Sequence, residues 1–119
     1  MSIIFFDIDG TIMDVNGSIP PSAAEAVRRL RQAGHHCIIN TGRPRIAMEP
    51  QLLELAFDGL VCSCGQYIQL DGRVLRHVGF DRDTSRKILE AGRRCLVDMY
   101  FEEARSEEHT SELQSRITI

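Results

Sequence analysis

Short runs of apolar residues alternate with more polar stretches along the first half of the chain. Residues 2–7, 36–40 and 59–63 each contain a continuous apolar run, which is typical of strands buried on both faces of a parallel sheet. Between the first two runs, apolar residues recur at helical spacing, so we predict a helix that opens on two prolines and stops at Gly34. A strand, a helix and a strand within about 40 residues predict a right-handed βαβ unit.

The second half of the chain shows turn signals between shorter patterned segments. Asp71-Gly72 suits a tight two-residue turn, which predicts a hairpin. Asp81 can accept hydrogen bonds at the start of a helix. In order, the segments predict a helix over 45–55 that Pro50 interrupts, a hairpin of strands 67–70 and 74–78, a helix from 82 to about 94, and a strand over 96–101. The predicted fold class is therefore α/β, with a Rossmann-like parallel sheet.

The composition is that of an ordinary soluble globular protein of 119 residues, with 43% apolar and 26% charged residues. The 14 basic and 17 acidic residues give a formal net charge of −3, which argues against a nucleic-acid or anionic-membrane partner. No apolar run approaches the roughly 18 residues that a membrane span requires. The four cysteines lack the spacing of a zinc site, so we expect reduced thiols and a cytoplasmic location.

Polar residues suited to chemistry follow the first two predicted strands. Asp7 and Asp9 end the first strand, with Gly10 directly after them, and Thr41 and Gly42 end the second. The carboxyl ends of strands in an open parallel sheet form the edge where ligands bind. Carboxylates there suit a divalent cation, and a hydroxyl with exposed amides suits phosphate oxygens. Each motif alone is often only a turn or a helix start, but together they predict a site for phosphoryl transfer.

These two motifs resemble those of the haloacid dehalogenase-like (HAD) phosphohydrolases. Asp-Ile-Asp-Gly-Thr at 7–11 is similar to the family's first motif, and Asn-Thr-Gly-Arg-Pro at 40–44 is similar to its second. Cys-Ser-Cys-Gly at 62–65, followed by the predicted hairpin, is similar to the Cof-type branch, in which a large cap follows the third core strand. The resemblance implies the N-terminal part of the family's core at residues 1–80 and the beginning of a cap domain at residues 81–104.

The resemblance also implies a role for each residue of the two motifs. Asp7 would attack phosphorus as the nucleophile, and Asp9 would serve as general acid and base. Asp7 and the backbone carbonyl oxygen of Asp9 would bind Mg²⁺. The expected phosphate-binding residues are Gly10, Thr41, Gly42 and Arg43, although Arg43 could equally cap the local backbone. These roles imply a Mg²⁺-dependent phosphatase of small phosphorylated metabolites that works through an aspartyl-phosphate intermediate.

Other functions remain open on the residues alone. The same Asp7 intermediate would serve a phosphomutase-type phosphotransferase, because access of water is what distinguishes hydrolysis from transfer. A non-catalytic module that binds phosphate or Mg²⁺ is a further alternative. A receiver-like domain is disfavoured, because its acceptor aspartate usually lies on a mid-chain strand, whereas the aspartate pair here opens the chain.

The sequence departs from the family pattern in several respects. Cys64 stands where the family usually has asparagine. The family also has a basic residue in a third motif and an acidic pair in a fourth, and we assign neither motif to any residue of this chain. Lys87, the only lysine, is expected on a solvated helix face. Residues 105–115 match the translation of a common sequencing-library adapter. We therefore expect 105–119 to be a non-native tail, the chain to be an incomplete and inactive fragment, and the third strand to form a sheet edge.

Overall fold

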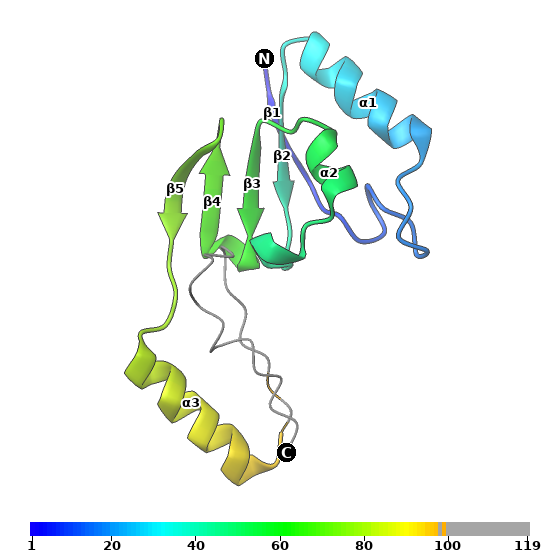
Figure 1. Cartoon of the computed structure of the whole chain (residues 1–119). Helices are drawn as coiled ribbons and strands as arrows, with labels where there is room; N and C mark the ends of the chain where they lie inside the picture. Colours follow the sequence, from blue (N-terminus) through cyan, green and yellow to red (C-terminus); the bar gives the residue numbers. More distant parts are fainter. Residues whose placement is uncertain (98, 100–119) are drawn as a thin grey trace.

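The computed structural model describes residues 1–97 and 99, which form a five-stranded sheet with helices beside it (Figure 1). The elements are β1 (Ile3–Phe6), α1 (Pro21–Gln32), β2 (His36–Asn40), α2 (Pro50–Glu54), β3 (Gly59–Cys62), β4 (Tyr67–Leu70), β5 (Arg73–His77) and α3 (Arg82–Cys95), with 3-10 turns at Arg45–Ala47 and Ser63–Gly65. Each strand and helix predicted before residue 96 has a counterpart in this order.

The five strands form one mixed sheet in the order β1-β2-β3-β4-β5. β1, β2 and β3 run parallel, and β4 and β5 continue the sheet as an antiparallel hairpin. Gly59, the first residue of β3, has no room for a side chain, because a Cβ atom there would lie 2.7 Å from the carbonyl oxygen of Gln69 on β4. The predicted α/β class and the parallel arrangement of the first three strands are confirmed.

β1, not β3, forms the open edge of the parallel part of the sheet. β3 pairs with β2 on one side and with β4 on the other, so the prediction that it forms an edge is wrong. Among the strands of residues 1–97 and 99, β1 pairs with β2 alone, and the side chains of Ile3 and Phe5 are 61% and 59% exposed. Burial on both faces therefore holds for the centre of β2 but is wrong for β1, because Ile3 and Phe5 alternate with Phe6 and point away from the face on which Phe6 packs against the hydrophobic core.

Pro50 divides the helix predicted over 45–55. The 3-10 turn at Arg45–Ala47 precedes α2, in which Pro50 takes the first helical position. Proline lacks the amide hydrogen that a continuous helix would need, but it is well tolerated at a helix start. Beyond α3, Leu96 adopts a left-handed conformation and Val97 lies outside any strand, so the predicted strand over 96–101 does not begin there. Residues 98 and 100–101 of that strand, and the tail predicted over 105–119, lie outside the described residues.

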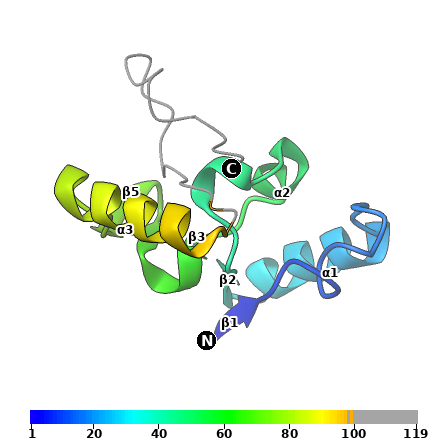
Figure 2. The same cartoon turned by 90° about the horizontal axis from the view of Figure 1, so that it is seen from below.

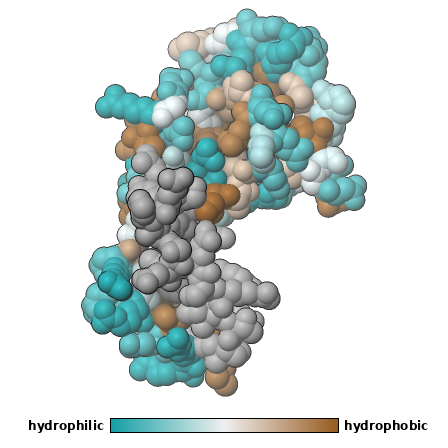
Figure 3. Space-filling view, viewed as in Figure 1, coloured by the Kyte–Doolittle hydropathy of each residue, from teal (hydrophilic) through white to brown (hydrophobic). Residues whose placement is uncertain are grey.

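Helices α1 and α2 pack on the parallel strands through one hydrophobic cluster. Val27 of α1 and Leu52 of α2 are almost fully buried with Cys37, Ile39 and Cys62 from the strands. Cys37 and Cys62 are therefore buried free thiols, as predicted. Other apolar atoms reach the surface of the sheet-bearing part of the molecule, where brown patches lie among hydrophilic ones (Figure 3). The core is thus concentrated between the helices and the central strands.

Helix α3 lies apart from the sheet, away from α1 (Figure 1 and Figure 2). It begins where the carboxylate of Asp81 accepts a hydrogen bond from the amide of Thr84 at 2.8 Å, which confirms the predicted N-cap. The division into a core at 1–80 and the start of a cap at 81–104 stays a prediction. Within residues 1–97 and 99, no helix has the length and apolar content needed to cross a bilayer.

Asp58, in the loop before β3, forms hydrogen bonds with both the start of β2 and helix α1. Its carboxylate accepts hydrogen bonds from the Cys37 amide at 2.8 Å and from the Arg31 guanidinium at 2.9 Å. Burial alone would raise the pKa of Asp58, but the hydrogen bonds from Arg31 and Cys37, together with the charge of Arg31, lower it below its usual value. The ionised carboxylate therefore stabilises the folded state.

We expect Asp58→Asn to remove a pH-dependent part of the stability. Because the folded-state pKa lies below the unfolded value of about 3.9, the ionised carboxylate stabilises the fold at neutral pH, and this contribution is lost as the pH falls through the folded-state pKa. The free energies of unfolding of the wild type and of Asp58→Asn, measured in urea, should therefore differ most at neutral pH and become equal in acid. Asp71→Asn, in an exposed turn, is the control and should leave the wild-type profile unchanged. Parallel profiles for wild type and Asp58→Asn would contradict the prediction.

Candidate active site

β1 and β2 bring the two sequence motifs to the same edge of the sheet. The strands pair in parallel, with Phe6 beside Ile39, so their carboxyl ends lie together. Asp7 follows β1 directly, and Thr41 follows β2. The structure thus places the loop that begins with Asp7 next to the loop that begins with Thr41, in the strand arrangement that the sequence predicted.

A tight loop with a buried anchor presents the two aspartates. The Ile8 side chain is fully buried, and its carbonyl oxygen accepts hydrogen bonds from the amides of residues 11–13. Asp7 and Asp9, on either side of Ile8, are exposed. Gly10 has a φ of +75°, in the left-handed region that favours glycine, and its amide donates to a carbonyl oxygen of the same loop at 2.8 Å. The Gly10 amide is therefore engaged within the loop rather than directed to a ligand.

Thr41 and Gly42 offer hydrogen-bond donors on the neighbouring loop. Thr41 is 5% exposed, and its hydroxyl oxygen accepts a hydrogen bond from the amide of Arg43 at 3.1 Å. A hydroxyl that accepts in this way keeps its own hydrogen for donation to a phosphoryl oxygen. Within the described residues, the Gly42 amide donates to no other backbone group. A Cβ atom on Gly42 would lie 3.7 Å from the Cys64 sulfur, so the loop after β3 borders the same segment.

The Arg43 side chain joins the two loops. Its Nε donates to Asp9 Oδ2 at 3.0 Å and its Nη2 donates to Oδ1 of the same carboxylate. Its Nη1 donates to both carboxylate oxygens of Glu49 at 3.1 Å. The hydrogen bonds from Arg43 are the largest influence on the pKa of Asp9 and lower it; burial raises the pKa less than these bonds lower it, and the charge of Arg43 lowers it a little further. Among the described residues the Arg43 guanidinium binds two carboxylates and not a backbone group, and its contact with a phosphate stays a prediction.

Glu49 was absent from the site predicted from the sequence. It lies six residues after Arg43, a separation that matches no helical contact spacing. The chain returns to Arg43 through the 3-10 turn that Pro44 precedes and Pro50 follows. The sequence signal for this contact was a turn bounded by two prolines between residues of opposite charge. Such a turn reverses the direction of the chain, but it does not determine which side chains then come into contact.

The motif residues offer a small set of oxygen ligands for a metal ion. Within residues 1–97 and 99, no group of three or more His, Cys, Asp or Glu side chains could hold a metal on its own. The Asp9 carboxylate is held by Arg43, whereas the Asp7 carboxylate is exposed. Mg²⁺ is usually bound by one or two carboxylates and completes its coordination with water and substrate phosphate. The oxygens of Asp7 and the Asp9 backbone fit such a site.

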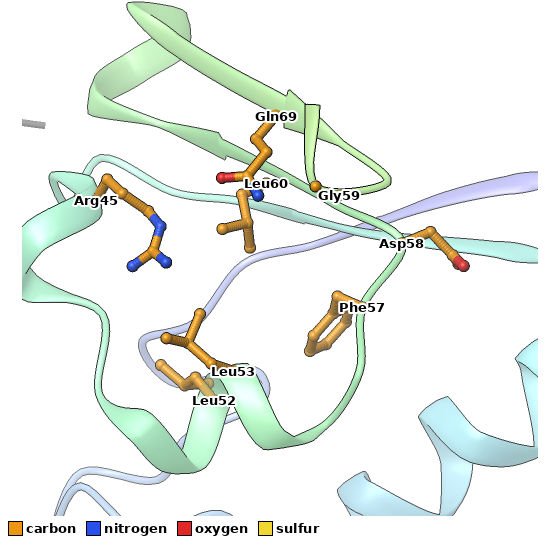
Figure 4. Close-up of a pocket in the computed structure, with 9 residues that line it drawn as sticks. Arg45, Leu52, Leu53, Phe57, Asp58, Gly59, Leu60 and Gln69 are labelled. Atoms are coloured by element: carbon orange, nitrogen blue, oxygen red, sulfur yellow. The ribbon is translucent and has the colours of Figure 1, made fainter. Parts of the chain in front are cut away.

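A separate hollow of about 190 Å³ lies beside α2 and the β3–β4 pair (Figure 4). Leu52, Phe57 and Leu60 contribute to its lining, and the guanidinium of Arg45 points into it. None of the motif residues 7–11 or 40–44 lines it. This hollow is therefore distinct from the candidate active site at the strand ends.

Comparisons with known proteins find relatives that carry phosphatase names. The chain is 34% identical over 88 residues to the Bacillus subtilis (strain 168) protein named "Putative phosphatase YkrA", and the match covers 74% of this chain and 34% of the relative. It is 39% identical over 67 residues to the pyridoxal phosphate phosphatase YbhA of Escherichia coli (strain K12), covering 56% of this chain and 25% of the relative. The chain thus matches about a third of the first curated relative and a quarter of the second.

The fold also matches solved structures of one superfamily. The HAD subclass IIB sugar phosphatase BT4131 superposes with a TM-score of 0.72 at 26% identity, over 87% of this chain and 41% of that one. The sequence profile of the haloacid dehalogenase-like hydrolases matches residues 4–114, a span that includes both motif loops. The chain therefore belongs to the haloacid dehalogenase-like hydrolase family, in its Cof-type branch.

Proposed function

We propose that this sequence supplies the N-terminal part of a Mg²⁺-dependent phosphatase of small phosphorylated metabolites. The observation that carries the proposal is the contact between the two motif loops, in which Arg43 of one loop binds Asp9 of the other. This contact joins the loop that carries Asp7 and Asp9 to the loop that carries Thr41 and Gly42, at the carboxyl ends of the paired strands β1 and β2. Phosphoryl transfer depends on such positioning of a nucleophile and of groups that stabilise the phosphoryl oxygens.

Asp7 is the nucleophile in this proposal. One of its carboxylate oxygens attacks the phosphorus of a monoester, the bond between phosphorus and the leaving oxygen breaks, and an aspartyl phosphate forms. The Thr41 hydroxyl and the Gly42 amide donate hydrogen bonds to the phosphoryl oxygens. Mg²⁺, when bound by the Asp7 carboxylate and the Asp9 carbonyl oxygen, neutralises negative charge on the phosphoryl group. Gly10 contributes the turn that places Asp9, and its amide reaches a phosphate only if it leaves its partner in the loop.

Asp9 moves the protons in both steps. It protonates the leaving oxygen in the first step, and in the second it removes a proton from the water that attacks the aspartyl phosphate, which frees Asp7 and inorganic phosphate. The hydrogen bonds from Arg43 lower the pKa of Asp9 and keep it ionised, which is the form that can accept a proton in the second step. The acid role in the first step requires Arg43 to release Asp9. That release also frees guanidinium hydrogens of Arg43 for a phosphoryl oxygen.

The substrate class is carried over from the relatives. The name of YbhA refers to pyridoxal phosphate, and BT4131 is described as a sugar phosphatase. Both substrates are small phosphate monoesters, and the net charge of −3 of this chain disfavours a polyanionic nucleic-acid substrate. We extend the same substrate class to the protein that carries this sequence. We also propose that the 119-residue chain by itself hydrolyses no phosphate monoester, since it matches about a third of YkrA.

A chimera tests the proposed activity. The part of this chain that aligns with YkrA is grafted in place of the 88 aligned residues of that protein. We expect the chimera to hydrolyse p-nitrophenyl phosphate only with Mg²⁺ present, and the 119-residue chain alone to release no nitrophenolate. Circular dichroism reports whether each protein is folded. A folded chimera without hydrolysis would overturn the proposed function, and hydrolysis by the chain alone would overturn its proposed inactivity.

A further inference from the structure

Two carboxylates bind different sides of the Arg43 guanidinium. Asp9 accepts hydrogen bonds from Nε at 3.0 Å and from Nη2, which together form one edge of the planar group. Glu49 accepts from Nη1 at 3.1 Å with both of its carboxylate oxygens. The two carboxylates therefore do not compete for the same hydrogens. When Asp9 leaves, the Nε and Nη2 edge becomes free as a unit, and the bonds to Glu49 can stay in place.

The fold holds Glu49 more firmly than it holds Asp9. The Asp9 side chain is 60% exposed and belongs to another loop, 34 residues before Arg43. Glu49 lies only six residues after Arg43. Its backbone is fixed between Met48, which is buried, and Pro50, the first residue of α2. The contact between Arg43 and Glu49 therefore lies within one short, anchored segment of the chain.

The Glu49 side chain takes no part in starting helix α2. Glu49 occupies the N-cap position, where a side chain often accepts hydrogen bonds from the first helical amides. Its carboxylate accepts none of these bonds and binds Arg43 instead. The backbone carbonyl oxygen of Glu49 accepts a hydrogen bond from the Leu52 amide at 3.0 Å, so the helix begins without the side chain. Replacing that side chain should therefore leave α2 intact.

We propose that Glu49 is a positioning residue, which holds Arg43 after Asp9 has released it, so that the Nε and Nη2 edge of the guanidinium binds two phosphoryl oxygens of the substrate. A contact through two parallel hydrogen bonds needs a planar group in a fixed orientation. Glu49 supplies that orientation through Nη1 and touches no reacting atom itself. The inference rests on the proposed phosphatase function, because it assigns Arg43 to the phosphoryl group.

The order of the Arg43 Nε–H group in the 119-residue chain tests the anchor without any activity. Nitrogen relaxation in NMR measures this order. In Asp9→Ala, which imitates release, we expect Nε to stay ordered because Glu49 still binds Nη1, and to become mobile when Glu49→Ala is added. Glu54→Ala, at an exposed carboxylate of α2, is the matched control and should not add this mobility. Loss of order in Asp9→Ala alone, or order retained in the variant that combines it with Glu49→Ala, would overturn the proposal.

The kinetics of the chimera test the contact with the substrate. A contact made equally in the ground state and the transition state affects binding alone, so Glu49→Ala should raise KM for p-nitrophenyl phosphate by about fivefold to tenfold and change kcat by less than about twofold. In an Arg43→Ala background, Glu49→Ala should change neither constant, because Glu49 acts through Arg43. Glu54→Ala should leave both constants as they are in the parent.

The kinetic outcomes separate this inference from the proposed function. With an active parent chimera, an unchanged KM in Glu49→Ala, or the same rise in KM with and without Arg43, would overturn the role of Glu49 alone. A lower KM in Glu49→Ala would show that Glu49 withholds Arg43 from the phosphate, which also overturns the proposal. A folded parent chimera without hydrolysis would instead overturn the proposed function on which the inference rests.

Discussion

Replacing Asp7 by asparagine is expected to lower phosphatase turnover of the chimera by at least about a thousandfold. The asparagine amide has nearly the shape of the carboxylate, but it cannot attack phosphorus, so no aspartyl phosphate forms and the remaining catalysis rests on binding alone. The Asp7 side chain is exposed, so the fold should be unaffected. Turnover of p-nitrophenyl phosphate measures the loss, and intact-protein mass spectrometry after acid quenching detects a covalent phosphate in the parent but not in the variant.

Asp14→Asn is the matched control for this substitution. Asp14 follows the same loop, where its carboxylate accepts hydrogen bonds from the amides of Asn16 and Ser18, both at 2.9 Å. Asparagine keeps an oxygen that can accept these bonds, so turnover should match that of the parent. If Asp7→Asn retained turnover within about tenfold of the parent, another group would have to be the nucleophile.

Asp9→Asn separates the two chemical steps in the same experiment. Nitrophenolate leaves readily without a proton, so the first step should continue, whereas hydrolysis of the aspartyl phosphate should slow without a base to activate water. The covalent phosphate should therefore accumulate in Asp9→Asn. Loss of turnover without accumulation would place the role of Asp9 before the transfer to Asp7 rather than after it.

Truncating Ile39 to alanine should lower the free energy of unfolding of the chain by about 2–5 kcal/mol. Ile39 is fully buried on β2, which pairs with β1 on one side and β3 on the other, and it belongs to the cluster that α1 and α2 share. Removing most of its side chain leaves a cavity among close-packed neighbours that relax only in part. Since small domains are stable by about 5–15 kcal/mol, urea unfolding should show a large loss.

Ile46→Ala provides the same chemical change outside the core. Ile46 lies in the turn before α2 and is 43% exposed, so its truncation should change the free energy of unfolding by no more than about 0.5 kcal/mol. Equal losses at Ile39 and Ile46 would contradict the burial that distinguishes them. Both variants should be compared at one protein concentration, because self-association would add to the apparent stability.

The site edge could be predicted from the sequence because its determinants are local. Each of the first two strands contains an uninterrupted apolar run, and each strand is followed directly by a polar motif residue, Asp7 after the first and Thr41 after the second. A helix between them makes a parallel pair the favoured arrangement, and parallel strands end at the same edge. Asp81 likewise marked the start of α3, because an N-cap acts within a few residues of itself.

The tertiary structure alone decided which segments meet. It placed β3 inside the sheet and left β1 at the edge, because the hairpin of β4 and β5 adds beside β3. It also brought Glu49 and Asp9 to Arg43, and it engaged the Gly10 amide within its own loop. Apolar patterns and turn residues act over a few positions of the chain, whereas these contacts depend on the packing of strands and turns that are distant in sequence. For that reason the kinds of functional group at the site could be predicted from the motifs. The ion pairs of Arg43 and the position of β1 at the sheet edge could be seen only in the fold.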